Sequence, residues 1–135
     1  MFIFDTDSLS NILKKAPSSL LLKKLKALPE HLQFTTSINI SEIYYGAHRS
    51  SNRKKILKAF EEKVFPNLGI LPFDTESGKI HGRLKARLEK KGLSKSEPDL
   101  RIASIAIQHK MVLVTGNTRR FNGIPGLNAE DRING

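Results

Sequence analysis

Residues 2–8 have the sequence Phe-Ile-Phe-Asp-Thr-Asp-Ser, and this stretch decides the fold. Its three apolar residues are typical of a short buried strand, while Asp and Ser residues often cap the start of a helix. We therefore predict a strand over residues 2–4 that gives way to a helix, with Leu9, Ile12 and Leu13 on its apolar face. A strand followed directly by a helix is the first part of a βαβ unit.

The same alternation of apolar and amphipathic segments continues along the chain. Further strands are predicted over residues 33–37, 69–73 and 111–115, with a last edge strand that starts near Leu127. Helices are predicted over residues 18–28, 39–47, 49–63, 76–91 and 99–110, with a short helix within residues 116–121. This order predicts an α/β fold with a mainly parallel sheet covered by helices on both faces. The length fits a single domain, residues 1–135.

Three acidic residues stand where predicted strands end or helices begin: Asp5, Glu42 and Asp99. Ligands of open α/β sheets bind beyond the carboxyl ends of the strands, so we expect these carboxylates to meet at one edge of the sheet. Each has a structural alternative when taken alone. Asp5 can cap a helix, Glu42 can complete a capping box with Asn39, and Asp99 can serve the first turn of a helix capped by Ser96.

Three carboxylates held together repel one another unless a cation lies between them. Mg²⁺ or Mn²⁺ suits such a site, because both ions prefer oxygen ligands and can bridge carboxylates to a phosphate. A bound ion of this kind activates water for phosphodiester hydrolysis. The three acids therefore indicate a metal site that acts on a phosphate-containing substrate.

The charge balance points to a polyanionic partner. The chain has 23 Lys and Arg residues against 13 Asp and Glu, a formal net charge of +10. Such an excess attracts RNA, DNA or an acidic protein. The absence of cysteine excludes disulfides and fits a reducing cytoplasm. We also expect no secretion signal and no transmembrane helix, because the apolar runs are too short.

Polar residues follow the predicted strand over residues 111–115. Thr115 and Asn117 can orient a ligand or serve the turn, and Arg119 and Arg120 can contact phosphate or lie in solvent. On a predicted helix near the start of the chain, Leu21, Leu22 and Leu25 can either receive a partner or belong to the core.

With these residues in view, the chain resembles the PIN-domain ribonucleases and, within them, the VapC toxins of bacterial toxin–antitoxin pairs. The resemblance runs nearly end to end. The segments that carry it are residues 2–6, 40–47, 99–103, 113–121 and 124–127.

The resemblance implies a PIN-like three-layer α/β/α fold and a metal-dependent endoribonuclease that cuts structured RNA, often tRNA, and inhibits translation. It also implies a homodimer and a cognate antitoxin that covers or enters the acidic site. By this resemblance Asp5, Glu42 and Asp99 would be the metal-binding acids, with Thr115 and Asn117 near the site. We further predict that Asn117 is catalytic together with the three acids. The residues that we expect to support the site are Thr6, Asp7, Thr115, Arg119 and Arg120.

The chain departs from the family at one place. Members often supply a fourth acid where this chain has Asn117, or just before the Phe, where it has Arg120. The number of metal ions is therefore open, and Asp7 is a candidate for the missing charge. Two alternatives stay open as well: a PIN-like RNA- or antitoxin-binding module with a decayed site, and a phosphatase of the haloacid-dehalogenase type with Asp5 as nucleophile.

Overall fold

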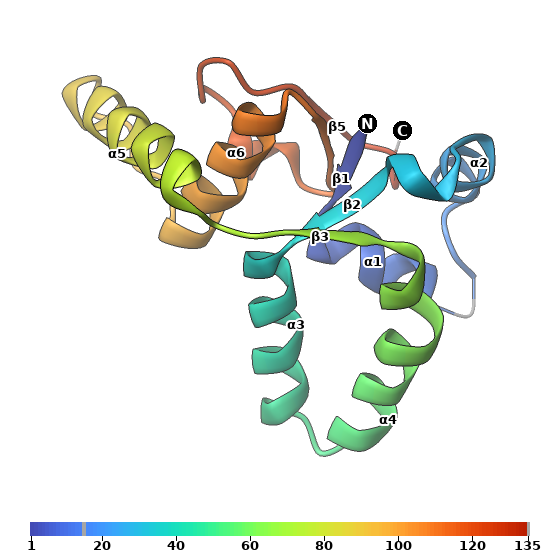
Figure 1. Ribbon diagram of the computed structural model, residues 1–135. Helices are drawn as coiled ribbons and strands as arrows, with labels where there is room; N and C mark the ends of the chain where they lie inside the picture. Colours follow the sequence, from blue (N-terminus) through green and yellow to red (C-terminus); the bar gives the residue numbers. More distant parts are fainter. Residues whose placement is uncertain (15, 135) are drawn as a thin grey trace.

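The computed structural model describes residues 1–14 and 16–134, and its centre is a five-stranded sheet (Figure 1). The strands lie in the order β3-β2-β1-β4-β5, and all neighbouring pairs are parallel. The strands are β1 (Phe2–Phe4), β2 (Gln33–Thr36), β3 (Gly69–Leu71), β4 (Val112–Val114) and β5 (Ala129–Glu130). The predicted α/β fold is thus confirmed, with every strand pair parallel.

Helices connect these strands. The α-helices are α1 (Thr6–Ile12), α2 (Ser19–Ala27), α3 (Ser37–Arg49), α4 (Arg53–Ala59), α5 (Thr75–Lys90) and α6 (Glu97–His109). Short helical turns are η1 (Glu30–Leu32), the π-helical η2 (Phe60–Val64), η3 (Phe65–Asn67) and η4 (Thr118–Phe121). Helices α5 and α6 lie on one side of the sheet, and α1, α3 and α4 lie on the other (Figure 1).

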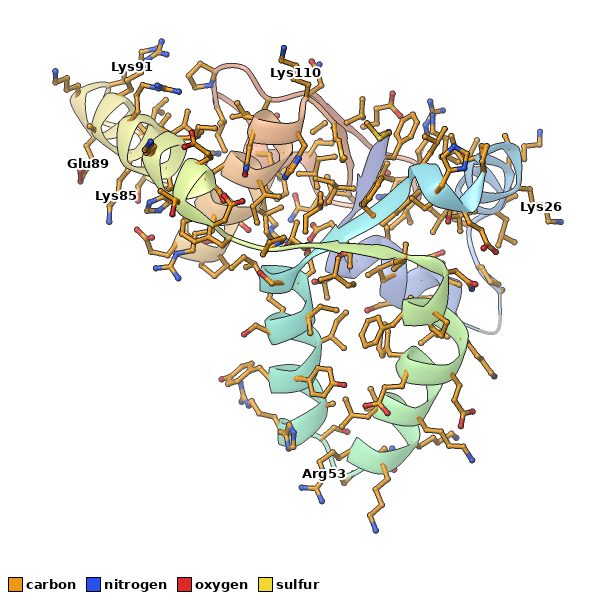
Figure 2. The ribbon with its side chains drawn as sticks, in the orientation of Figure 1. Lys26, Arg53, Lys85, Glu89, Lys91 and Lys110 are labelled. Atoms are coloured by element: carbon orange, nitrogen blue, oxygen red, sulfur yellow. The ribbon has the colours of Figure 1, made fainter. Side chains whose placement is uncertain are left out.

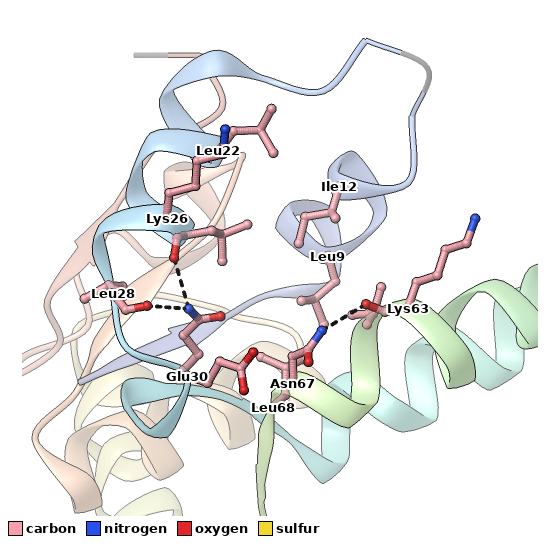
Figure 3. A pocket seen from close by; sticks show the side chains of 12 residues that line it. Leu9, Ile12, Leu22, Lys26, Leu28, Glu30, Lys63, Asn67 and Leu68 are labelled. Atoms are coloured by element: carbon pink, nitrogen blue, oxygen red, sulfur yellow. Dashed lines mark hydrogen bonds between the residues drawn. The ribbon is translucent and has the colours of Figure 1, made fainter.

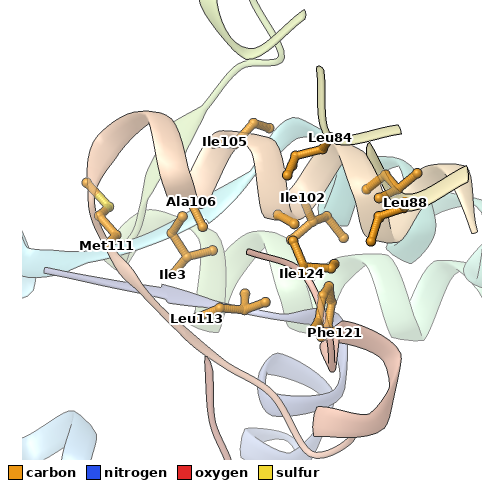
Figure 4. Close-up of a cluster of buried hydrophobic side chains, with 12 residues drawn as sticks. Ile3, Leu84, Leu88, Ile102, Ile105, Ala106, Met111, Leu113, Phe121 and Ile124 are labelled. Atoms are coloured by element: carbon orange, nitrogen blue, oxygen red, sulfur yellow. The ribbon is translucent and has the colours of Figure 1, made fainter. Parts of the chain in front are cut away.

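Each face of the sheet has its own hydrophobic cluster, because successive strand residues point to opposite faces. Ile3 and Leu113 pack with α5 and α6 in the cluster of Figure 4. Phe4 and Val114, the next residues along, pack with α1 to α4 on the other face. All four are fully buried. Successive residues of β1 and β4 thus contribute to the two hydrophobic clusters that join the sheet to the helices on either side.

Most helix starts follow the predicted local rules. Asp5 caps α1, Ser18 caps α2, and Asp74 forms a capping box with Ser77 at α5. Ser96 caps α6. These side-chain acceptors satisfy backbone N–H groups that have no partner within the helix.

Several predicted boundaries were wrong. Helix α3 begins at Ser37 with Thr36 as its cap, so Asn39 lies inside the helix and does not open it. The α-helix predicted over residues 49–63 is shorter, because Arg49 ends α3, α4 spans Arg53–Ala59, and the chain then continues as the π-helical η2. The helix predicted over residues 99–110 begins earlier, because Ser96 caps α6 and allows it to start at Glu97.

Basic side chains project from the outer ends of the helices. Figure 2 shows Lys26, Arg53, Lys85 and Lys91 pointing away from the body of the protein. The net charge of +10 is therefore presented at the periphery. Within the part of the chain that the structure describes, no helix combines the length and the apolar character needed to span a bilayer.

Candidate functional site

The acidic residues meet where the strand order reverses. The chain runs from β1 to β2 and β3 on one side, and then returns to place β4 on the other side of β1. Such a reversal leaves a crevice at the carboxyl ends of the two central strands. Asp5 follows β1 and Thr115 follows β4 at this point, and the Asp5 backbone N–H donates to the Val114 carbonyl at 2.9 Å.

Asp5 is fully buried, and its carboxylate accepts hydrogen bonds from several parts of the chain. Its Oδ1 accepts the Thr6 backbone N–H at 2.8 Å and the Asn39 side-chain amide at 2.7 Å. Its Oδ2 accepts the Thr115 hydroxyl at 2.9 Å and Arg120 Nη1 at 3.2 Å. Asp5 is therefore both the cap of α1 and the centre of a network that joins distant parts of the chain.

Glu42 reaches the same site from α3. Its Oε1 accepts the Thr6 hydroxyl at 3.0 Å, and that hydroxyl accepts the Asn39 amide at 3.1 Å. Glu42 is half-buried and three residues after Asn39, so both side chains project from one side of the helix. The capping-box alternative for this pair does not hold, since Thr36 caps the helix.

Asp99 enters from the first turn of α6 and is 6% exposed. Its Oδ1 accepts Arg120 Nε at 3.0 Å and also accepts Arg120 Nη2. The cap of α6 is the Ser96 hydroxyl, which accepts the Asp99 backbone N–H at 3.3 Å. The Asp99 side chain is thus directed at the site.

Arg120, from η4, lies among all of these acids. Its Nη1 is 3.2 Å from Asp5 and 3.7 Å from Asp7, and its Nη2 is 3.9 Å from Glu42 and is also paired with Asp99. The sequence left two alternatives for this residue, contact with phosphate and exposure to solvent. Its guanidinium instead makes ion pairs with four carboxylates.

The electrostatics of the cluster follow from burial. Desolvation raises the pKa of Asp5, against the opposing effects of Arg120 and Thr115. Burial also raises the pKa of Glu42, and the neighbouring charges of Asp5 and Asp99 add to this. Burial works against the charged form of Arg120, but hydrogen bonding to Asp99 and the charges around it raise its pKa overall. Arg120 is therefore a permanent cation in this site.

The remaining predicted residues divide into two groups. Thr6 and Thr115 contact the acids directly, as described, and Asp7 lies at the rim beside Arg120. Asn117 and Arg119 are exposed. The Asn117 backbone N–H donates to the Thr115 hydroxyl at 3.2 Å, so this residue supports Thr115 through its backbone. The catalytic role predicted for its side chain stays a prediction.

Asn39 is the residue of the site that the sequence did not assign to it. It is fully buried, and its amide donates to both Asp5 and Thr6. A signal was present, because a polar residue three positions before Glu42 lies on the same face of a helix. Asn39 joins β1 to α3 and orients the Asp5 carboxylate.

The donor chemistry of the site fits a divalent ion. Asp5, Glu42 and Asp99 each direct an oxygen at one cationic group, the Arg120 guanidinium, and carboxylate oxygens are the ligands that Mg²⁺ and Mn²⁺ prefer. As they stand, no three Asp, Glu or His side chains within residues 1–14 and 16–134 are close enough together to hold an ion. The acids surround the guanidinium, so an ion would have to take its place.

A separate pocket of about 350 Å³ lies on the face covered by α1 and α2 (Figure 3). Leu9 and Ile12 from α1 and Leu22 and Leu25 from α2 line it. The charged residues of the lining, Lys26, Glu30 and Lys63, are exposed. Leu21 belongs to the core instead, since it is fully buried. Leu25 is half-buried and packs against the same cluster, so the core alternative holds for both residues. Contact of Leu22 with a partner stays a prediction.

The sequence matches the family model described as "PIN domain" over residues 2–127. It is 31% identical over 130 residues to the tRNA(fMet)-specific endonuclease VapC of Salmonella typhimurium, covering 96% of each chain. It is 32% identical over 133 residues to ribonuclease VapC2 of Rickettsia felis, covering 97% of each.

Solved structures show the same likeness. The chain superposes with a TM-score of 0.88 and 28% identity on VapBC2 from Rickettsia felis bound to a DNA fragment from its promoter, covering 96% of this chain and 97% of that one. For DNA-bound VapBC from Salmonella typhimurium the TM-score is 0.87 at 29% identity, with 96% of each chain covered. The predicted PIN-like fold is confirmed.

Proposed function

This chain belongs to the PIN-domain family, and from that premise we propose that it is a Mg²⁺- or Mn²⁺-dependent endoribonuclease toxin that hydrolyses phosphodiester bonds in structured RNA. The observation that carries the proposal is the convergence of Asp5, Glu42 and Asp99 on one cation at the crevice of the sheet. The names of full-length relatives as ribonucleases support the reaction class.

In this proposal the acids hold the ion, which when bound supplies Lewis acidity toward a phosphate oxygen and lowers the pKa of water. Asp5 and Asp99 are placed by buried contacts and provide the fixed ligands. Glu42 is half-buried and lines a pocket of about 460 Å³ together with residues of α3 and the start of α6. We propose that a phosphodiester enters there. Thr6, Thr115 and Asn39 orient the carboxylates by the hydrogen bonds described above.

The substrate we propose is tRNA. A net charge of +10 favours a polyanion, and the Salmonella relative is named a tRNA(fMet)-specific endonuclease. Cleavage of tRNA would inhibit translation. Sequencing of RNA ends after induced expression identifies the target. A single dominant cut within one tRNA supports the proposal, and cuts confined to other RNAs would contradict the tRNA assignment.

We further propose that a cognate antitoxin neutralises the protein and docks in the pocket between α1 and α2. The VapBC likeness supports such a partner. The pocket is lined mainly by apolar residues, and its exposed charged residues are two lysines and Glu30, a net positive charge that favours an apolar segment with acidic residues. Leu22→Glu should abolish copurification with the antitoxin. The control is Leu93→Glu, which changes an exposed leucine beyond α5, and equal capture of both variants would exclude this surface.

The family match removes the reason to consider a phosphatase of the haloacid-dehalogenase type. The binding module with a decayed site keeps one specific observation in its favour, the occupation of the acidic site by Arg120. The expected homodimer stays a prediction that light scattering of the purified protein can check.

Cleavage of RNA by purified variants tests the proposed activity. We expect wild type to cleave with Mg²⁺ or Mn²⁺ and to stop when EDTA removes the ion. Glu42→Gln and Asp99→Asn should each reduce the rate by about 100-fold or more, because they remove metal-binding charge. Glu89→Gln is the matched control, since Glu89 is exposed on α5, and it should cleave like wild type. Binding of RNA by wild type without cleavage would establish the binding module instead.

A further inference from the structure

Arg120 differs from an ordinary surface arginine in the number and burial of its partners. Its guanidinium contacts Asp5, which is fully buried, and Asp99, which is 6% exposed, as well as the half-buried Glu42. The Arg120 side chain itself is 24% exposed. Ion pairs in such a partly desolvated site are screened less than pairs on an open surface.

The backbone of η4 delivers Arg120 to this position. The next residue, Phe121, is 3% exposed and packs in the cluster between the sheet and α6. The Arg120 guanidinium carbon lies 5.2 Å from the centre of the Phe121 ring. The neighbour on the other side, Arg119, is exposed, and its carbonyl accepts the Lys95 amine at 3.1 Å. One arginine of the pair is thus held in the site while the other faces solvent.

The charges of the site allow a divalent ion to compete with the Arg120 guanidinium for the same carboxylates. One guanidinium faces four carboxylates, so the site remains negative while Arg120 occupies it. A divalent ion brings twice the charge and can bind the same oxygens at shorter distances than a guanidinium allows. Both cannot occupy the centre of the cluster, because the oxygens that would bind the ion are those that accept from Arg120.

We propose that Arg120 is a built-in cation that occupies the metal position of this site and must move out before a divalent ion can be bound by Asp5, Glu42 and Asp99 together. Arg120 is then a positioning residue, since it acts through the carboxylates. Without metal, Arg120 holds the carboxylates together. It also raises the metal concentration that is needed to fill the site. This inference rests on the proposed metal-dependent function.

Direct measurement of Mn²⁺ binding by isothermal titration calorimetry tests the proposal without relying on activity. The proteins are the full-length wild type, Arg120→Gln, Arg120→Lys and Arg119→Gln. Arg119→Gln removes the same charge from the adjacent exposed position. We expect Arg120→Gln to bind Mn²⁺ about ten-fold more tightly than wild type, and Arg119→Gln to stay within about two-fold. Arg120→Lys should fall between them, because a lysine keeps the charge but loses the planar fork.

Thermal unfolding of the same proteins provides a second readout. Without metal, Arg120→Gln should melt below wild type, because the acids lose their cation. Saturating Mn²⁺ should raise the melting temperature of Arg120→Gln more than that of wild type. An arginine with only a structural role would lower the melting temperature without tightening Mn²⁺ binding.

The outcomes separate this inference from the function on which it rests. Equal Mn²⁺ affinity in wild type, Arg120→Gln and Arg119→Gln would overturn the competition and leave the metal-dependent nuclease intact. Absence of Mn²⁺ binding in every variant would contradict the proposed function as well. Tight binding in Arg120→Gln that persists in the double variant with Asp5→Asn would show that the ion binds elsewhere, and would also overturn the inference. If Arg120→Gln fails to fold, the comparison of Arg120→Lys with wild type decides the question.

Discussion

Two aspartates of this protein each follow a strand and cap the next helix, but their pKa values are shifted in opposite directions. Asp5 follows β1 and caps α1, and Asp74 follows β3 and caps α5. Asp5 is fully buried and its pKa is raised, chiefly by desolvation. Asp74 is exposed and its pKa is lowered, chiefly by hydrogen bonds from Ser77.

The difference lies in what surrounds each residue. Asp74 is at the edge of the sheet, and its main partner is Ser77 in its own helix. Asp5 is at the centre of the sheet, where Asn39, Thr115 and Arg120 arrive from three other elements. A carboxylate at a strand end thus becomes a candidate functional group when the strand is central and other elements converge on it.

The two aspartates should differ most in how much each contributes to the rate of RNA cleavage. Asp5→Asn should reduce RNA cleavage by about 1,000-fold, because it removes a negative charge from the proposed metal site. Asp74→Asn should cleave within about two-fold of wild type, since Asn also serves as a helix cap. Cleavage rates on one RNA at saturating Mn²⁺ measure both. Equal losses in the two variants would show that the central position of Asp5 in the sheet gives it no special role in cleavage.

A smaller effect is expected for the hydroxyls that serve each aspartate. The Thr115 hydroxyl donates to Asp5 and the Ser77 hydroxyl donates to Asp74, each at 2.9 Å. Thr115→Val should lower the free energy of unfolding by about 2 kcal/mol, because a buried carboxylate loses a hydrogen bond. It should also slow cleavage by about ten-fold through misplacement of Asp5.

Ser77→Ala is the control for this change. It should lower the free energy of unfolding by about 1 kcal/mol and leave cleavage unaltered. Urea unfolding and cleavage rates of the two variants make the comparison. A Thr115→Val protein with normal cleavage would exclude a positioning role for Thr115.

The smallest effect is the pH dependence of stability in metal-free protein. Because the pKa of Asp5 is raised above its ordinary value of 3.8, the folded chain binds this proton more readily than the unfolded chain. The free energy of unfolding should therefore fall as pH rises from 3.8 through the raised pKa, and Asp5→Asn should remove that fall.

Asp74 should behave in the opposite sense, because its pKa is lowered below 3.8. The free energy of unfolding should rise as pH increases from the lowered pKa to 3.8, and Asp74→Asn should remove that rise. A series of urea unfolding curves across pH measures both contributions. The same pH profile in wild type and both variants would contradict the contrast between the two sites.

The sequence was sufficient for the features that depend on neighbouring residues. The strand over residues 2–4 and the caps at Asp5 and Ser96 were predicted from local rules, and the structure confirms them. The expectation that Asp5, Glu42 and Asp99 meet at one edge of the sheet followed from the order of strands and helices.

The contacts that complete the site were beyond such rules. Arg120 and Asp5 are 115 residues apart, and Asn39 and Asp5 are 34 apart. Whether an arginine in a turn faces solvent or an acidic site depends on the path of η4, which the buried Phe121 anchors. Side-chain direction in a short turn is set by such packing and not by sequence pattern.

We propose that Asp5, Glu42 and Asp99 form one metal site whose centre Arg120 occupies. An anomalous difference map from crystals of Arg120→Gln grown with Mn²⁺ tests this directly. We expect one strong peak within bonding distance of carboxylate oxygens from all three residues. A map with no peak among these three side chains, in crystals where Mn²⁺ is bound elsewhere or not at all, would contradict it.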